Sequence, residues 1–84
     1  TLGGDGAYYQ DHDMRLYQPA FSVPVVDTTG AGDTFTGYFL ANLHRGPEKA
    51  LRIATAAAAL AVGTKGAAPG IPTANQVKDF LIKQ

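Results

Sequence analysis

The stretch "VVDTTGAGDTF", Val25 to Phe35, places three small residues between two carboxylates. The two valines before Asp27 predict the end of a strand, because β-branched side chains favour strands. From Phe35 onward, apolar residues recur every four positions, which predicts a helix. The stretch therefore spans a strand-to-helix junction, where ligands bind in open α/β sheets. We expect an α/β fold with a ligand site at this turn.

Gly30, Ala31 and Gly32 are suited to hold an anion at the start of the predicted helix. A helix N-terminus presents N–H groups without partners and the positive end of the helix dipole. Glycines let a ligand approach the backbone closely, because they carry no side chain. We expect these residues to bind a phosphate or an oxyanion that forms during a reaction.

Asp33 follows the three small residues directly, and a carboxylate is unusual beside an anion site. Its presence is explained if it accepts a proton from a hydroxyl that attacks phosphorus nearby. The alternative is an ordinary aspartate at a helix start, which is common. The stretch is not a phosphate-binding Gly-Lys-Ser/Thr loop. It is not a dinucleotide fingerprint either, since Phe35 stands at the third glycine position.

The rest of the chain predicts a hairpin before the junction and two more helices after it. Apolar and polar residues alternate in 14–18, and 7–10 is aromatic and extended. Pro47 predicts the first turn of a second helix, and Thr73 with Gln76 predicts a capping box for a third. The expected order is strand (1–2), hairpin (7–10 and 14–18), strand (23–26), helix (31–45, closed by Gly46), helix (47–62), loop (63–72) and helix (from 73).

Composition excludes several classes of protein. Seven basic residues balance seven acidic ones, so no charge field favours nucleic acid. The longest apolar run, Ile53 to Val62, is too short to span a bilayer, and no signal peptide is visible. The lack of cysteine fits a reducing compartment. The chain starts on Thr1 within what resembles a strand end, so we expect a piece of a longer polypeptide.

Two further groups of residues receive structural interpretations. His12 lies between two aspartates, but a solvated hairpin tip is favoured over a metal site. Tyr8, Tyr9 and Tyr17 are explained by packing between strands rather than by a ligand-stacking surface.

With these residues in place, "DTTGAGDTFTGYF" resembles the second signature of the ribokinase-like (PfkB) carbohydrate kinase family. "TLGGDGA" resembles the strand and turn beside the nucleotide in that family, and "GTKGAAPGIP" resembles its cation-binding loop. The resemblance implies a ribokinase-like three-layer α/β fold. Residues 1–84 would form its C-terminal nucleotide-binding and catalytic part, without the N-terminal substrate-binding part and lid.

The resemblance also implies roles for individual residues. Asp33 would be the catalytic base, and Gly30, Ala31 and Gly32 would form the anion hole. The nucleotide would contact Thr1, Gly3, Gly4, Asp5, Gly6 and Thr55. A monovalent cation, typically K⁺, would be held by Asp27, Thr29, Ala61, Thr64, Gly66 and Gly70. Two positions depart from the family pattern, since Tyr38 replaces a small residue and Gly70 replaces a frequent serine.

The implied activity is ATP-dependent phosphorylation of a sugar hydroxyl, on a substrate like ribose, fructose or 2-keto-3-deoxygluconate. ATP with Mg²⁺, and K⁺, are the implied cofactors. A cytoplasmic homodimer formed through the lid is the implied assembly, with no nucleic-acid or membrane partner. Two alternatives stay open: a nucleoside kinase of the same family, and a non-catalytic nucleotide-binding protein on the same fold.

Overall fold

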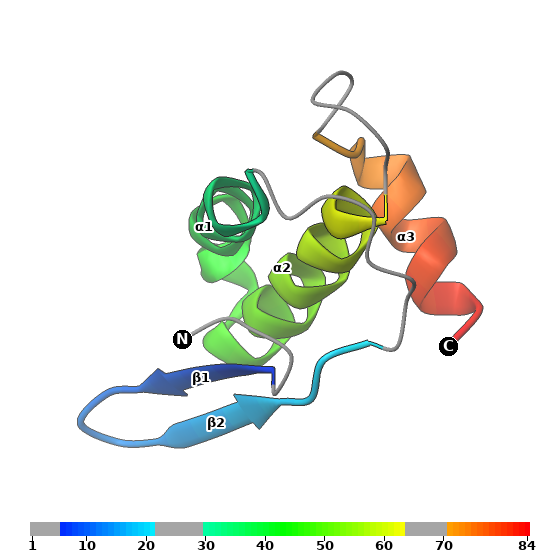
Figure 1. Cartoon of the computed structure of the whole chain (residues 1–84). Coiled ribbons are helices and arrows are strands. Elements are labelled where there is room, and N and C mark those ends of the chain that lie inside the picture. The colour runs from blue at the N-terminus through cyan, green and yellow to red at the C-terminus, as the bar shows by residue number, and fades with distance from the viewer. Residues whose placement is uncertain (1–5, 22–29, 64–70) are drawn as a thin grey trace.

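A central helix organises the molecule in this computed structural model, which describes residues 6–21, 30–63 and 71–84. The elements are β1 (Ala7–Gln10), β2 (Arg15–Gln18), α1 (Ala31–Asn42), the 3₁₀ helix η1 (Leu43–Arg45), α2 (Pro47–Val62) and α3 (Ala74–Ile82). Figure 1 shows the three α-helices side by side with α2 in the middle, and the β1–β2 hairpin beneath them. Helix α2 contacts α1, α3 and both strands. The strands expected at 1–2 and 23–26 and most of the expected loop lie outside the described residues.

The β1–β2 hairpin is confirmed, with β2 beginning at Arg15 rather than at Met14. The strands are antiparallel, and Tyr8 pairs with Tyr17 across them, their ring centroids 4.8 Å apart. At the tip, Asp11 accepts hydrogen bonds from the Tyr9 hydroxyl (2.7 Å) and from the Asp13 N–H (2.8 Å). The bond from Tyr9, followed by the backbone bonds, lowers the pKa of Asp11. The same bond raises the pKa of Tyr9.

The ends of the helices show where local signals decided the structure. The expected helix over 31–45 and its closing residue Gly46 are confirmed, but only residues 31–42 are α-helical. Residues 43–45 form η1 instead, and Gly46 closes it at φ 103° by donating to the Leu43 carbonyl at 2.9 Å. This tight turn redirects the chain, because α2 begins immediately afterwards at Pro47.

The capping box of α3 is confirmed in both of its bonds. The Thr73 N–H donates to the Gln76 side-chain oxygen at 2.8 Å, and the Gln76 N–H donates to the Thr73 hydroxyl at 3.2 Å. Two of the amides that a helix start leaves without partners are satisfied in this way. The start of α3 is therefore determined by its own sequence.

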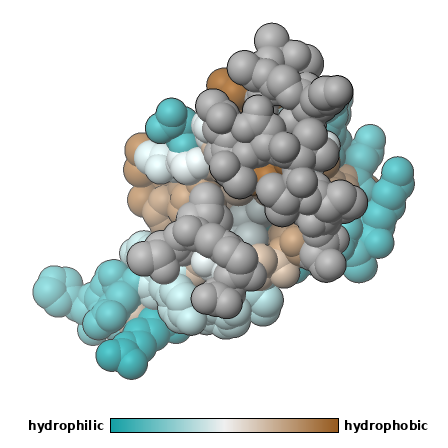
Figure 2. Space-filling view, in the orientation of Figure 1, coloured by the Kyte–Doolittle hydropathy of each residue, from teal (hydrophilic) through white to brown (hydrophobic). Residues whose placement is uncertain are grey.

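Alanines of α2 form the centre of the core. Ala56 and Ala57 are fully buried and make one cluster with Val77 of α3. Larger, half-buried side chains surround this cluster: Phe21, Tyr38, Ile53, Leu60, Phe80 and Leu81. Small side chains on α2 leave room for close approach of its neighbours. Figure 2 shows hydrophilic residues over the hairpin tip and the outer side of α3. Among the described residues, no helix combines the length and apolarity needed to cross a membrane.

Candidate active site

The turn at Gly30 sets the geometry of the candidate site. Gly30 is the N-cap of α1 and adopts a left-handed conformation, with φ 81°, which residues with a side chain rarely adopt. The first backbone bond of the helix runs from the Thr34 N–H to the Gly30 carbonyl, at 2.9 Å. The four N–H groups of residues 30–33 therefore have no partner within the helix. They lie at the positive end of its dipole.

The space outside this turn is open to a ligand. Gly32 is exposed, and a Cβ built on Gly30 or on Gly32 would meet no described atom within 4 Å. Side chains at these positions would occupy the space through which an anion reaches the amides. The anion hole expected at Gly30, Ala31 and Gly32 stays a prediction.

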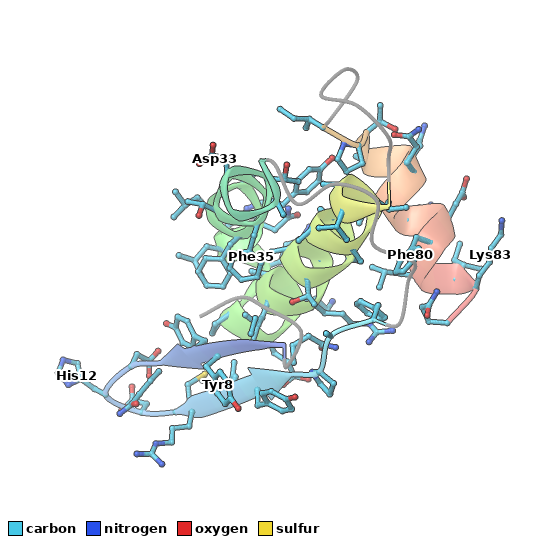
Figure 3. All side chains as sticks on the ribbon, in the orientation of Figure 1. Tyr8, His12, Asp33, Phe35, Phe80 and Lys83 are labelled. Carbon is cyan, nitrogen blue, oxygen red and sulfur yellow. The ribbon has the colours of Figure 1, made fainter. Side chains whose placement is uncertain are left out.

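Asp33 is the third residue of α1 and is exposed. Ala31 and Thr34 lie on the opposite, buried side of the same turn, with 8% and 5% of their surfaces exposed. Because these two residues anchor the turn in the interior, Gly32 and Asp33 are turned outward. Figure 3 shows the Asp33 side chain at the first turn of α1, directed away from the hairpin. A carboxylate and a set of amides that the helix leaves without partners thus share one helical turn.

Aromatic contacts hold α1 against the hairpin. The rings of Phe35 and Phe39 are nearly parallel, with centroids 6.1 Å apart, and Phe39 also contacts Tyr9 of β1 at 5.7 Å. Both phenylalanines are half-buried. The turn that carries Asp33 is therefore fixed relative to β1, which follows the expected nucleotide-binding turn.

Gly6 is the one residue of that expected turn that the structure describes. It is buried at φ 110°, and a Cβ there would collide with the Gln18 carbonyl oxygen and approach the Ala20 nitrogen to 3.0 Å. Packing against the chain after β2 is thus sufficient to require glycine. Its contact with a nucleotide stays a prediction.

Thr55 lies in the interior and its hydroxyl already has a partner. It is buried, with 3% of its surface exposed, and its hydroxyl donates to the Leu51 carbonyl at 2.7 Å. Threonine within a helix commonly bonds to the carbonyl four positions earlier, so this bond could have been predicted from the sequence. The contact of Thr55 with adenine stays a prediction.

Ala61 is the one described member of the expected cation site. It lies near the end of α2, where the dipole is negative and the Gly63 N–H is directed at the Ala59 and Ala61 carbonyls. Oxygen atoms in that setting suit a hard cation. The remaining expected site residues lie outside the described residues: Thr1, Gly3, Gly4, Asp5, Asp27, Thr29, Thr64, Gly66 and Gly70.

His12 is exposed at the hairpin tip, as expected (Figure 3). Within residues 6–21, 30–63 and 71–84, no three His, Asp or Glu side chains gather closely enough to hold a metal ion.

Comparison with known proteins places this turn in a family context. Residues 1–74 match the family described as pfkB family carbohydrate kinase. Ribokinase of Bacillus subtilis (strain 168) is 45% identical over 83 residues, covering 96% of this chain and 28% of the relative. Fructokinase-1 of Oryza sativa subsp. japonica is 38% identical over 90 residues, covering 96% of this chain and 28% of the relative.

Solved structures agree in fold. The crystal structure of aminoimidazole riboside kinase from Salmonella enterica, complexed with aminoimidazole riboside and an ATP analog, superposes with a TM-score of 0.81. It is 40% identical and covers 95% of this chain and 29% of that protein. The chain therefore spans less than a third of the length of each of these proteins. The expected α/β, ribokinase-like fold is confirmed for this part.

Proposed function

Because the chain belongs to the pfkB family of carbohydrate kinases, we propose that the protein transfers the γ-phosphoryl group of ATP to a sugar hydroxyl. The observation that carries this proposal is the first turn of α1, where an exposed carboxylate, Asp33, stands beside amides that the helix leaves without partners. Binding alone requires no proton acceptor, so this turn favours a kinase over a non-catalytic nucleotide-binding protein.

The turn can perform both parts of a phosphoryl transfer. The Asp33 carboxylate takes the proton of the acceptor hydroxyl, and the hydroxyl oxygen forms a bond to the γ-phosphorus. The bond from that phosphorus to the bridging oxygen breaks, and ADP leaves with the electron pair. Amides of Gly30, Ala31, Gly32 and Asp33 stabilise the negative charge on the transferred group. General-base assistance of this kind contributes about 10²–10⁴ in rate.

The proposal also assigns residues to the nucleotide and to the cations. The nucleotide would lie along residues 1–6 and reach Thr55, and Mg²⁺ would neutralise its phosphates when bound. A K⁺ ion would steady the turn from behind, held by Asp27, Thr29, Ala61, Thr64, Gly66 and Gly70. Residues 1–84 would act as the catalytic part of a longer, cytoplasmic kinase that dimerises through its lid.

The acceptor is proposed at the level of its class, a furanose-like sugar such as ribose or fructose, or 2-keto-3-deoxygluconate. Relatives named ribokinase and fructokinase support this class. A riboside acceptor is the second candidate, because a solved structure of 40% identity is a kinase complexed with aminoimidazole riboside. An ADP-release assay of the enzyme with these sugars and with ribosides distinguishes the two candidates.

Asp33→Asn tests the chemistry directly. We expect kcat to fall by about 10²-fold or more while ATP binding changes little, since the amide cannot accept the proton. Asp79→Asn, which alters an exposed aspartate of α3, is the matched control and should keep wild-type kcat. Near-normal turnover by Asp33→Asn would refute its role as the base.

A further inference from the structure

A cavity lies at the far end of α1 from Asp33. It has a volume of about 550 Å³ and is bounded by α1, η1, α2 and α3. Asn42, one of its lining residues, is about 14 Å along the helix axis from Asp33 at the rise of an α-helix. The volume is within the range of small-molecule sites, about 300–1,000 Å³. Because of its distance from Asp33, the cavity is distinct from the proposed phosphoryl-transfer site.

The charge of this cavity is one-sided. Three cationic side chains line it, Arg45 from η1, Arg52 from α2 and Lys78 from α3, and none of the described aspartates or glutamates does. Within the described part of the chain, none of the three has a carboxylate in ion-pair contact. Arg52 instead lies over the ring of Phe21, 5.4 Å from its centroid. Three like charges around one hollow favour the binding of an anion.

The backbone adds donors at the same place. Ala74 and Asn75 line the cavity and are the first two residues of α3. The capping box uses the amides of Thr73 and Gln76, so the helix provides no partner for those of Ala74 and Asn75. The Asn42 side chain donates to the Tyr38 carbonyl at 2.8 Å, which leaves its oxygen as an acceptor. The polar groups of the cavity are thus mostly donors.

The remaining lining is apolar. Ile53, Val77 and Leu81 come from two helices, and Val77 is buried while the other two are half-buried. A bare inorganic ion would leave these side chains unused. A ligand that combines an anionic group with an apolar body would contact both parts.

We propose that this cavity binds a small organic phosphate, with the phosphate near Arg45, Lys78 and the start of α3 and the apolar body over Ile53 and Leu81. The proposal is independent of the kinase activity, because it concerns different residues and is tested by binding. It gives the protein a second anion site, outside the turn that carries Asp33.

Phenyl phosphate is the probe, titrated into the protein by calorimetry. We expect one binding event at the cavity, weakened about threefold or more by Lys78→Met and by Arg45→Met. Lys83→Met, which alters the exposed C-cap residue of α3 outside the cavity (Figure 3), is the control and should leave Kd unchanged. Both replaced side chains are exposed, so the variants should fold, and their melting temperatures check this.

Binding at the α1 turn would be indifferent to Lys78→Met and Arg45→Met, so these variants separate the two sites. No binding, or a Kd that neither variant alters, would overturn the proposal. Inorganic phosphate should bind more weakly than phenyl phosphate, because it leaves Ile53 and Leu81 uncovered. Equal affinity for the two probes would overturn the assignment of an organic ligand.

Discussion

Gly32 and Gly37 are both exposed glycines of α1, but only Gly32 belongs to the proposed anion site. A Cβ at either position would meet no described atom within 4 Å, and neither glycine has a positive φ. Alanine should therefore stabilise the helix by about 0.5 kcal/mol at each position. At Gly32 the added methyl group also occupies the approach to the amides, so we expect Gly32→Ala to lower kcat by about 10²-fold.

Gly37→Ala provides the comparison, since it should raise the melting temperature to a similar extent and keep wild-type kcat. Urea denaturation and steady-state kinetics on the two variants give the required numbers. If Gly32→Ala loses activity while it gains stability, glycine is required at this position for function and not for folding. An active Gly32→Ala enzyme would remove the anion hole from this turn.

At the scale of elements, the hairpin depends on the ionised form of Asp11. Its pKa is lowered mainly by the hydrogen bond from the Tyr9 hydroxyl, so the folded hairpin favours the carboxylate. The resulting stabilisation is present above the ordinary aspartate pKa, near 4, and is lost as pH falls through the lower, folded pKa. Tyr9→Phe should therefore raise the pKa of Asp11 toward its ordinary value, measured by NMR titration.

The backbone bonds from Asp13 and Met14 remain in that variant, so part of the lowering should persist. Tyr8→Phe is the control, because Tyr8 lies on the other face of β1 and pairs with Tyr17. If Tyr8→Phe and Tyr9→Phe shifted the pKa of Asp11 equally, the bond at the tip would not be its cause.

Helices α1 and α3 are linked through Tyr38. Its hydroxyl donates to the Pro72 carbonyl, next to the N-cap of α3, and burial raises its pKa. Its ring packs on the cluster of Ala56, Ala57 and Val77. Tyr38→Phe keeps the ring and removes one partly buried bond, so we expect unfolding free energy to fall by about 0.5–1.5 kcal/mol, measured by urea denaturation. An unchanged value would mean that water replaces the hydroxyl.

At this scale the sequence predicted those features that depend on a few neighbouring residues. Pro47, Thr73 with Gln76, and the Gly30–Asp33 turn act within one helical turn, and the structure has a helix start at each. The change from α-helix to the 3₁₀ helix η1 before Gly46 was not predicted, because it depends on how the chain turns into α2. The role of Tyr38 and the cavity between the helices were not predicted, since both require three helices to be placed in space.

At the scale of the whole molecule, α2 determines how the other elements meet, because its alanines leave room for them. Ala57 is fully buried against Val77 of α3. Ala57→Leu adds volume that the cluster cannot accept without moving α3, so we expect a loss of about 1–3 kcal/mol in unfolding free energy. Ala41→Leu, at an exposed position of α1, should change it little. Hydrogen exchange should show faster opening of α3 than of α1 in Ala57→Leu, and equal stability of the two variants would show that α3 is not held by this contact.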